Sequence, residues 1–512
     1  MKKKYGIIQI IVAFILAFLY FYSLQFSTHN LVDTDGYYHI KLAYIYRTQG
    51  LITEFPGAYY TILRDNFYDD QFLFHVLLIP FTFGDLVLWG KIAAVIFASL
   101  SITAFYWFLS KNGIAWPLFW AMILLTSQKF VIRANMTRPE SLSVLFFILG
   151  VHFAISRKYK SLFFISILYS LIHGSFFILS IFIVVYLLIN YAKKKRFDYT
   201  LIFCNLGGIF LGLFINPYFP KNIYTVYMVY LNGILGILKS VPLSAPIEEW
   251  MPLNFLLFIN ETYVIIILFL ISLFFIKKNQ NKHSLLFLIT SLILFILTMR
   301  HNRFVVFWSV ATVILCAFTL NKSFKNIAGL WNFPLAFGKR LSIGKYKKAM
   351  LIIFILIAVF LFSNFFYIHK QKLAESNYFN NYYNCSAWIN NNTPKDTNIF
   401  IMTWSQFPAL FFYNHDNRYT LGLDEYKMYF YDKELYLKYV GLTREGIRES
   451  GRIMNDPEKI RKIIKEDFNS SYIFLDERDL IFTHTYLYNL AKKDNNFKKG
   501  YEDAYCSVYR VK

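Results

Sequence analysis

Long stretches of apolar residues recur along most of this chain, and they constrain its fold more than any motif does. Examples are residues 7–19, 176–189 and 351–362. With their flanks, several of these stretches reach the roughly 20 residues that a helix needs to cross a bilayer. The 512 residues are 56% hydrophobic and 16% charged, which is more apolar surface than a soluble core could bury. The sequence therefore predicts a polytopic α-helical membrane protein.

The basic residues are distributed in a way that indicates membrane topology. Residues 1–370 contain 33 of the 53 basic residues and only 12 of the 31 acidic ones. The tail, residues 371–512, is therefore nearly neutral. The excess lies in short clusters between apolar runs, such as residues 2–4, 157–160 and 193–196. Clusters of this kind are typical of cytoplasmic loops. This distribution argues against a nucleic-acid partner.

Placing every basic cluster in the cytoplasm predicts a cytoplasmic N-terminus and an outer C-terminus, in a protein of the cell (inner) membrane. The first helix is expected to be uncleaved, because no small-residue cleavage site follows it. We expect a transmembrane domain over residues 1–370 and an extracytoplasmic α/β domain over 371–512. About eleven spanning helices are predicted, near residues 6–24, 86–109, 114–127, 141–156, 161–172, 174–191, 200–216, 261–276, 284–299, 304–320 and 350–367.

Acidic residues before position 370 gather on one side of this predicted membrane. Eleven of the twelve fall at or near the outer face, mainly in the loops 25–85, 128–140 and 217–260. Long loops also hold more residues of every kind, and this alternative stays open. Residues 71–83 are apolar but short, which predicts an interfacial or re-entrant helix. The outer loops are thus where we expect a site.

The first outer loop begins with Leu-Val-Asp33-Thr-Asp35-Gly-Tyr37-Tyr-His39. A pair of carboxylates with this spacing can take a proton from a hydroxyl or amide group, or can hold a divalent cation. Alternatively, an aspartate here caps the following helix, whose N-terminus favours negative charge. The spacing by itself does not decide between these roles.

The segment Asp35-Gly-Tyr-Tyr-His resembles the first acidic motif of the GT-C glycosyltransferases, above all of the catalytic subunit of archaeal oligosaccharyltransferase. Three more segments follow in the family's order. Residues 133–143, with Arg133 and Glu140, take the place of its second acidic motif. Pro246-Ile-Glu-Glu249 is similar to its Thr-Ile-x-Glu motif, and residues 300–304 resemble its arginine segment.

This resemblance implies transfer of a sugar or oligosaccharide from a polyprenyl phosphate or diphosphate carrier, with inversion, to a glycan, lipid or protein acceptor at the outer membrane face. It implies a site of four kinds of residue. They are the catalytic carboxylates Asp35, Asp33, Glu140 and Glu249; the phosphate-binding arginines Arg138, Arg133, Arg303 and Arg300; the supporting residues His39, Tyr37 and Glu248; and an Mg²⁺ or Mn²⁺ site formed by Asp35, Glu140 and Glu249.

Two departures from the family pattern change what is expected. The second motif of the family has an acid where this chain has Arg138, so one metal ligand is replaced by a cation. The family's Trp-Trp-Asp-Tyr-Gly motif would fall at residues 403–408, which lack the aspartate. We therefore expect an acceptor other than the asparagine of a protein sequon, such as a lipid-linked glycan or a surface polymer.

Each of these residues has a simpler alternative role. The arginines at outer helix ends could reach lipid headgroups, and Glu249 could belong to an amphipathic interfacial helix. The spacing of His39, His75 and His173 is not that of a zinc motif, so we expect them to support or pack. Two alternative functions stay open. One is a transporter or flippase of lipid-linked glycans, which needs charges at mid-membrane depth. The other is a non-catalytic surface-assembly protein.

The tail reads as alternating strands and helices. Cys385 and Cys506 would share the oxidising outer compartment, so a disulfide between them is permitted but not required. Cys204 and Cys316 are expected only to pack within the membrane. Strands are predicted at residues 398–402, 471–475 and 504–511, and helices at 378–391, 432–441, 457–466 and 484–492.

Overall fold

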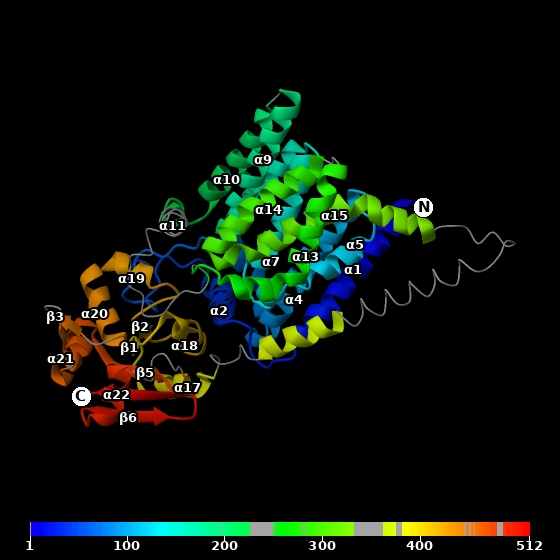
Figure 1. Ribbon diagram of the computed structural model, residues 1–512. Coiled ribbons are helices and arrows are strands. Elements are labelled where there is room, and N and C mark those ends of the chain that lie inside the picture. Colours follow the sequence, from blue (N-terminus) through cyan, green and yellow to red (C-terminus); the bar gives the residue numbers. More distant parts are fainter. Residues whose placement is uncertain are drawn as a thin grey trace. The chain divides into compact units, whose positions relative to one another are not determined.

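The computed structural model describes most of the 512-residue chain, in two compact units (Figure 1). Unit 1 contains Met1–His29, Lys91–Phe214 and Glu248–Glu375, and unit 2 contains Asn30–Gly90, Ile215–Ile247 and Ser376–Lys512. The first outer loop therefore groups with the C-terminal region, across the boundary expected at residue 370. The described residues are 2–195, 197–225, 249, 251–279, 282–331, 362–374, 381–444, 447–449, 452–454, 456–478 and 485–512.

Six helices in the described part of the chain are long and apolar enough to cross a bilayer. Their uninterrupted apolar runs explain why the sequence located each of them. In unit 1, α13, α14 and α15 pack against one another (Figure 1). The predicted polytopic helical membrane fold is confirmed. The six are α1 (Lys2–Gln25), α4 (Leu86–Lys111), α9 (Phe177–Lys194), α13 (Phe255–Asn279), α14 (Lys282–Arg300) and α15 (Val305–Trp331).

The other predicted spans are shorter or broken, so the described residues do not reach eleven. The span expected at 114–127 is wrong, because α5 (Pro117–Leu124) has eight residues and rises only about 12 Å. Helices α6 (Gln128–Asn135) and α7 (Glu140–Ile155) meet at a bend of 112° and count as one span at most. Helices α8 (Tyr159–Ile172) and α10 (Tyr199–Ile215) are 14 and 17 residues long. Most of 350–367 lies outside the described residues.

Helix α10 approaches α8 closely because it presents two glycines four residues apart. A Cβ atom at Gly208 would lie 2.5 Å from the carbonyl oxygen of Phe163, and one at Gly212 would lie 2.7 Å from that of Ile167. Small residues with this spacing let two membrane helices pack backbone to backbone. A larger side chain at either position would force the two helices apart.

Unit 2 contains a five-stranded sheet in the order β2-β1-β5-β7-β6. The first three strands are parallel, and β7 and β6 continue antiparallel. The three strands and four helices predicted in the tail are confirmed. The strands are β1 (Asn398–Ile401), β2 (Arg418–Tyr419), β5 (Ser470–Asp476), β6 (Phe497–Glu502) and β7 (Cys506–Val511), beside a small hairpin of β3 (Ile447–Glu449) and β4 (Arg452–Met454). The helices are α17 (Tyr383–Asn392), α18 (Phe407–Tyr413), α19 (Tyr426–Tyr431), α20 (Lys433–Thr443), α21 (Pro457–Lys462) with the π-helical turn η8 (Ile463–Asp467), and α22 (Tyr486–Lys493).

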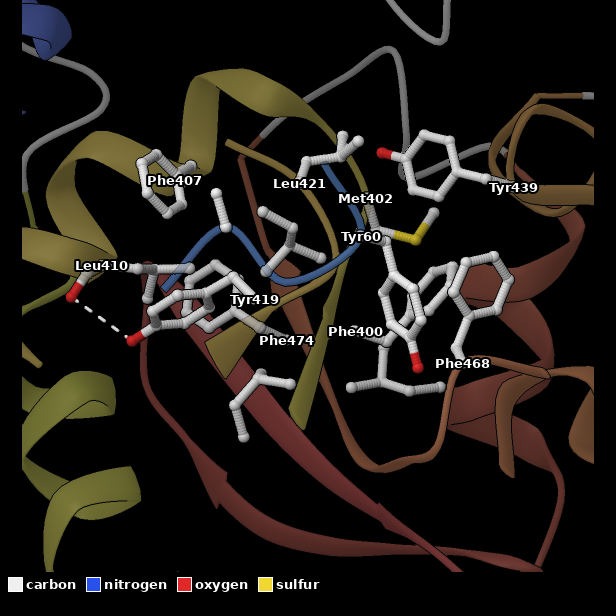
Figure 2. Close-up of a cluster of buried hydrophobic side chains, with 14 of the residues drawn as sticks. Tyr60, Phe400, Met402, Phe407, Leu410, Tyr419, Leu421, Tyr439, Phe468 and Phe474 are labelled. Carbon is white, nitrogen blue, oxygen red and sulfur yellow. Dashed lines mark hydrogen bonds between the residues drawn. The ribbon is translucent and has the colours of Figure 1, made fainter. Parts of the chain in front are cut away.

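The first outer loop extends this sheet. Ala58 forms a parallel bridge with Tyr419 of β2, and Tyr419 donates its N–H to the Gly57 carbonyl at 2.9 Å. Figure 2 shows Tyr60 of this segment beside Phe468, with ring centres 5.5 Å apart. The same loop carries α2 (Thr34–Gln49), α3 (Phe72–Leu78) and the turn η1 (Ile79–Thr82). Helix α3 together with η1 is the short apolar helix predicted at 71–83. Helix α2 also packs on α18, so this loop is part of the core of unit 2.

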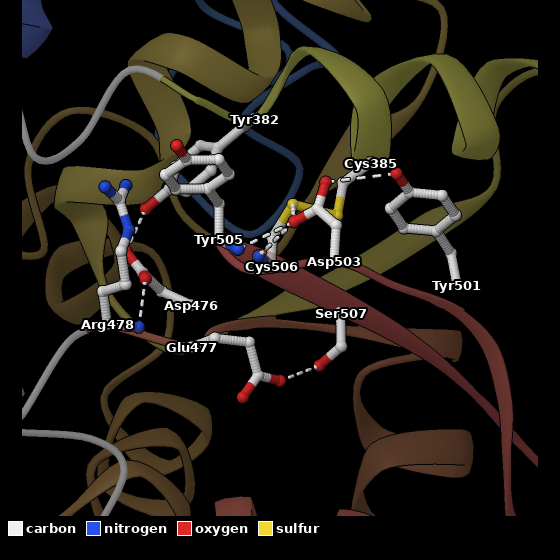
Figure 3. Close-up of a disulfide and its surroundings, with 10 residues drawn as sticks. All are labelled: Tyr382, Cys385, Asp476, Glu477, Arg478, Tyr501, Asp503, Tyr505, Cys506 and Ser507. Carbon is white, nitrogen blue, oxygen red and sulfur yellow. Dashed lines mark hydrogen bonds between the residues drawn. A yellow bond between two sulfur atoms is a disulfide. The ribbon is translucent and has the colours of Figure 1, made fainter.

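A disulfide joins Cys385 of α17 to Cys506 of β7 (Figure 3). Both cysteines are fully buried, and the bond closes a loop of 121 residues. Asp503 lies beside it and accepts the Cys506 N–H at 2.9 Å. Sulfurs joined in a disulfide cannot bind a metal as thiolates, so this Cys-Asp-Cys group is not a metal site. The permitted pairing is confirmed.

Replacing both cysteines by serine is expected to lower the free energy of unfolding of unit 2 by about 2–5 kcal/mol, because a long loop is released in the unfolded chain. The measurement is the thermal midpoint of the purified protein, with limited proteolysis of the C-terminal region. Cys204→Ser, on α10, is the control. Equal midpoints for the double variant and the control would contradict the expectation.

Candidate functional site

The bend between α6 and α7 carries three of the predicted site residues in unit 1. Ser127 begins α6 by accepting the Phe130 N–H at 3.4 Å. The helix ends at Asn135, and Pro139 precedes α7. Glu140 is then the first residue of α7, where the helix dipole favours a carboxylate. Because of this break, the side chains of Arg133, Arg138 and Glu140 lie in one cluster.

Arg133 bridges two of the predicted catalytic carboxylates. Its Nη1 lies 3.3 Å from Glu140 Oε1, and its Nη2 lies 3.3 Å from Glu249 Oε1. Arg138 donates a hydrogen bond to the same oxygen of Glu249. The Arg133 side chain is 6% exposed and that of Glu249 is 24% exposed, so the network is shielded from most solvent.

Arg303 joins this network through both its backbone and its side chain. It lies on the short helix η5 (Asn302–Phe304), and its N–H donates to the Glu249 carbonyl at 3.2 Å. Its Nη2 is 3.3 Å from Nε2 of His173, whose Nδ1 lies 3.0 Å from the hydroxyl of Ser143. Because an arginine only donates, Nε2 of His173 accepts and Nδ1 carries the proton.

The charges of these groups follow from their surroundings. Burial, followed by the charge of Arg303, lowers the pKa of His173 well below its usual value, so this histidine is neutral. Burial alone would raise the pKa of Glu249, but Arg133, Arg138 and Arg303 outweigh it and hold the pKa below its usual range. Three guanidinium groups thus face two carboxylates, and the excess positive charge suits a phosphate oxygen.

The remaining predicted carboxylates lie in unit 2. Asp33 occupies the N-cap position of α2, and the capping alternative stays open. Asp35 lies in the first turn of α2, half-buried, with its Oδ1 shielded from solvent. Tyr37 is buried against Phe412, with ring centres 5.0 Å apart.

His39, one helical turn after Asp35, bonds to another buried histidine. Its Nδ1 lies 2.8 Å from Nε2 of His75, and Nδ1 of His75 lies 2.7 Å from Oδ2 of Asp69. The sequence predicted supporting roles for both histidines but did not identify Asp69. It also missed Ser143, because the contact with His173 spans 30 residues and no spacing rule indicates it.

The predicted residues therefore form two sets. Arg133, Arg138, Glu140, Glu249 and Arg303 come together in unit 1, whereas Asp33, Asp35, Tyr37 and His39 lie together on or next to α2 in unit 2. The convergence of the two sets stays a prediction. Arg300 is exposed at the end of α14, and Glu248 lies outside the described residues.

The metal site expected from Asp35, Glu140 and Glu249 fits poorly in unit 1. Arg133 stands between Glu140 and Glu249, where a bridging cation would have to lie. A divalent ion there would also face the charges of Arg138 and Arg303. Carboxylate oxygens are suitable ligands for Mg²⁺, and Oε2 of Glu140 is buried with no hydrogen-bond partner among the described residues. The Oε1 atoms of Glu140 and Glu249, however, already pair with Arg133.

No family model and no curated protein matches the sequence. Solved structures do match across nearly the whole chain. The apo oligosaccharyltransferase of Archaeoglobus fulgidus aligns with a TM-score of 0.65 and 13% identity, over 96% of this chain and 73% of that one. ArnT of Cupriavidus metallidurans bound to undecaprenyl phosphate aligns with a TM-score of 0.59 and 12% identity, over 98% and 97%. Both are GT-C fold glycosyltransferases.

The chain has the GT-C fold. A third structure, the Archaeoglobus fulgidus enzyme tethered to an acceptor peptide with an NVT sequon, aligns over 98% of this chain with a TM-score of 0.59. The fold that the sequence motifs implied is confirmed. At these identities the likeness shows the fold alone, and the chemistry has to be argued from the residues of this chain.

Glu249→Gln is expected to destabilise unit 1 in a way that depends on pH. The folded-state pKa of Glu249 is depressed, so its stabilising contribution is complete above the unfolded value of about 4.3 and is lost progressively as the pH falls from that value through the lower folded-state pKa. The thermal midpoint of the variant should lie several degrees below wild type at pH 7, and this gap should be smaller at pH 3.

Asp198→Asn is the control, since Asp198 pairs with Arg157 at 3.4 Å, away from these arginines. A difference in thermal midpoint between wild type and Glu249→Gln that stays the same from pH 7 to pH 3 would contradict the depressed pKa.

Proposed function

We propose that this protein is a membrane glycosyltransferase that moves a sugar or oligosaccharide from a polyprenyl phosphate or diphosphate donor to an acceptor at the outer membrane face. The observation that carries the proposal is the grouping of Arg133, Arg138 and Arg303 around Glu249 in a GT-C fold. ArnT, which shares this fold, has been solved with undecaprenyl phosphate bound. A guanidinium cluster of this kind matches the phosphate of such a donor.

In the proposed reaction the arginines stabilise the departing phosphate. The acceptor hydroxyl forms a bond to the anomeric carbon while the bond from that carbon to the carrier phosphate oxygen breaks, with inversion. The phosphate oxygen keeps the electron pair, and Arg133, Arg138 and Arg303 neutralise its charge. Neutral His173 holds Arg303 in place.

Asp35 is the proposed base that takes the acceptor's proton. Glu249 is a weaker base at neutral pH, because its arginine neighbours stabilise the carboxylate. Glu140 orients Arg133 through the contact at 3.3 Å. The acceptor is proposed to be a lipid-linked glycan or surface polymer, since residues 403–408 lack the acid of the sequon-reading motif.

The transporter alternative is less well supported by the described spans. Lys91, the main charged residue expected there, lies near the start of α4, and Glu261 lies near the start of α13, so neither is at the middle of its helix. Its ammonium group donates to the Thr28 carbonyl and lies 5.1 Å from the Phe26 ring. A transported ion or headgroup needs charges at mid-membrane depth, and Lys91 has a local structural role.

Asp35→Asn is expected to lower kcat for sugar transfer by about 10²- to 10⁴-fold, the usual effect of losing a general base. Arg138→Ala should lower kcat/KM for the donor about tenfold or more, and Arg138→Lys should not restore it, because a lysine lacks the planar fork. The assay is transfer of radiolabelled sugar from a panel of polyprenyl-phosphate donors by membranes with matched protein levels.

Arg157→Ala is the control, because Arg157 is 51% exposed and pairs with Asp198 at 3.4 Å, away from this cluster. Transfer by Asp35→Asn at the wild-type rate would remove Asp35 from the site. The absence of transfer from every donor would reject the proposed function.

Removing divalent cations is expected to leave most of the transfer activity, because guanidinium groups rather than a metal neutralise the leaving phosphate. Membranes treated with EDTA and then assayed with and without added Mg²⁺ or Mn²⁺ test this point. If activity is lost with EDTA and restored by either ion, a metal site must form with ligands beyond the paired Glu140 and Glu249.

A further inference from the structure

One lysine of unit 2 is buried without an acidic partner. Lys41 lies on α2 and is 8% exposed, and it makes no hydrogen bond or ion pair with any residue that the structure describes. Its ammonium group lies instead 5.3 Å from the ring centre of Tyr44 and 5.9 Å from that of Phe412. Burying an ammonium group is costly unless an anion compensates its charge. The described residues of the chain do not supply that anion.

The groups around Lys41 leave its charge available to a ligand. Asp416, in the loop after α18, is the acid whose charge acts on Lys41, but it already pairs with Lys395 at 3.0 Å. Partial burial, followed by the charge of Lys41, lowers the pKa of His415, so this histidine is neutral at pH 7. Burial lowers the pKa of Lys41 itself to about 8, which leaves the ammonium group charged at pH 7. The surroundings of Lys41 therefore favour a bound anion.

A row of aromatic rings continues from Lys41 to the surface of unit 2. Phe412 and Tyr413 are half-buried neighbours on α18, with ring centres 4.9 Å apart. The ring of Tyr413 also lies 5.5 Å from that of Tyr383 on α17, which is 63% exposed. Aromatic faces are electron-rich and attract the polarised C–H groups of sugar rings. This aromatic row of Phe412, Tyr413 and Tyr383, beside a lone cation, suits a sugar that carries a negative charge.

The position of Lys41 on α2 relates these residues to the proposed base. Lys41 follows Asp35 by six residues in one continuous helix, which corresponds to a rise of about 9 Å along the helix axis. A short oligosaccharide spans such a distance. Tyr37, between the two, packs on Phe412 with ring centres 5.0 Å apart, so α2 and α18 together hold both ends of this stretch.

We propose that the ammonium group of Lys41 and the aromatic row beside it bind an acidic sugar of the acceptor glycan. The inference rests on the proposed function and names the class of acceptor, a glycan whose sugars carry carboxylate or phosphate groups. Lys41 donates charge-assisted hydrogen bonds to the anionic group, the rings hold neighbouring sugars, and the hydroxyl to be glycosylated lies at Asp35. A phospholipid headgroup offers the same anion without sugar rings, so the aromatic row favours a glycan as the occupant.

Binding of acidic and neutral sugars to the purified full-length protein tests this subsite. The acidic probes are trigalacturonate and mannose 6-phosphate, and their neutral matches are the carboxyl-reduced trisaccharide and mannose. Isothermal titration calorimetry in nanodiscs of zwitterionic lipid should show that wild type prefers an acidic probe. Lys41→Gln should lower that affinity about 10- to 100-fold, the usual effect of losing a charge-assisted hydrogen bond. Tyr383→Ala should lower the affinity for the trisaccharide about two- to tenfold.

The pH dependence of binding distinguishes the charge of Lys41 from a structural role. Because its pKa is about 8, wild-type affinity for an acidic probe should fall about tenfold between pH 7 and pH 9 as the ammonium group loses its proton. Lys41→Arg should bind at both pH values, since a guanidinium group stays charged. If Lys41→Gln does not accumulate as folded protein, this comparison decides the question alone, and the same fall in Lys41→Arg as in wild type would overturn the subsite.

The other titratable groups near Lys41 do not account for such a change. Partial burial lowers the pKa of His415 and burial raises that of Tyr413, so neither changes its charge between pH 7 and pH 9. On α3, which also packs on α2, His75 bonds to His39 instead. The titratable groups on the elements around Lys41 are Tyr44 of α2, Tyr413 of α18, and His415 and Asp416 of the loop that follows α18.

Lys438→Gln is the matched control, because Lys438 of α20 pairs with Asp467 at 2.6 Å and should bind the probes as wild type does. Equal affinity of wild type and Lys41→Gln for both acidic probes would overturn the subsite. Retention of phosphatidylglycerol by wild type but not by Lys41→Gln, with equal affinity for sugars, would assign the cation to a lipid headgroup instead. In either case, sugar transfer by wild type from a polyprenyl-phosphate donor would leave the glycosyltransferase proposal intact. The absence of transfer from every donor would reject that proposal and the acceptor role of Lys41 with it.

Discussion

The charged cluster of unit 1 depends on the ion pairs that the buried guanidinium group of Arg133 makes. It touches Glu140 and Glu249 at 3.3 Å each, and removing one member would leave a buried charge uncompensated, at about 3–5 kcal/mol. This constraint explains the interrupted course of α6 and α7. A continuous helix would place Arg133 and Glu140 seven residues apart, two turns along one face, whereas the 112° bend lets them meet.

The sequence predicted the fold best where one physical term dominates. Helices α1, α4 and α15 were located because a long apolar run is stable in a bilayer as a helix. The prediction of a span at 114–127 was wrong because hydropathy measures the apolar side chains and takes no account of the backbone conformation. Trp116 adopts a left-handed conformation before Pro117, so α5 starts late and ends after eight residues. The bridge between Ala58 and Tyr419 was not predictable, since its strand partners are 361 positions apart.

The arginine and glutamate cluster of unit 1 contains residues that the motifs had grouped, but its pairings were not predicted. The resemblance of motifs brought Arg133, Glu140, Glu249 and Arg303 into one group, and the structure places them together. It could not indicate that the two glutamates would be bridged by an arginine instead of a metal, because a motif records residue types without side-chain directions. Asp69 escaped notice for a similar reason: its position depends on a turn in which Gln71 donates its N–H to the Asp69 carboxylate.

The arginines of unit 1 limit which of its carboxylates could act as a base. A general base is most effective when its pKa is near the working pH, and the arginines that make unit 1 suitable for phosphate lower the proton affinity of Glu249. The same charges cannot both stabilise a leaving phosphate and keep a carboxylate basic. Within unit 1, Glu249 is therefore better suited to holding Arg133 and Arg138 in place than to accepting a proton.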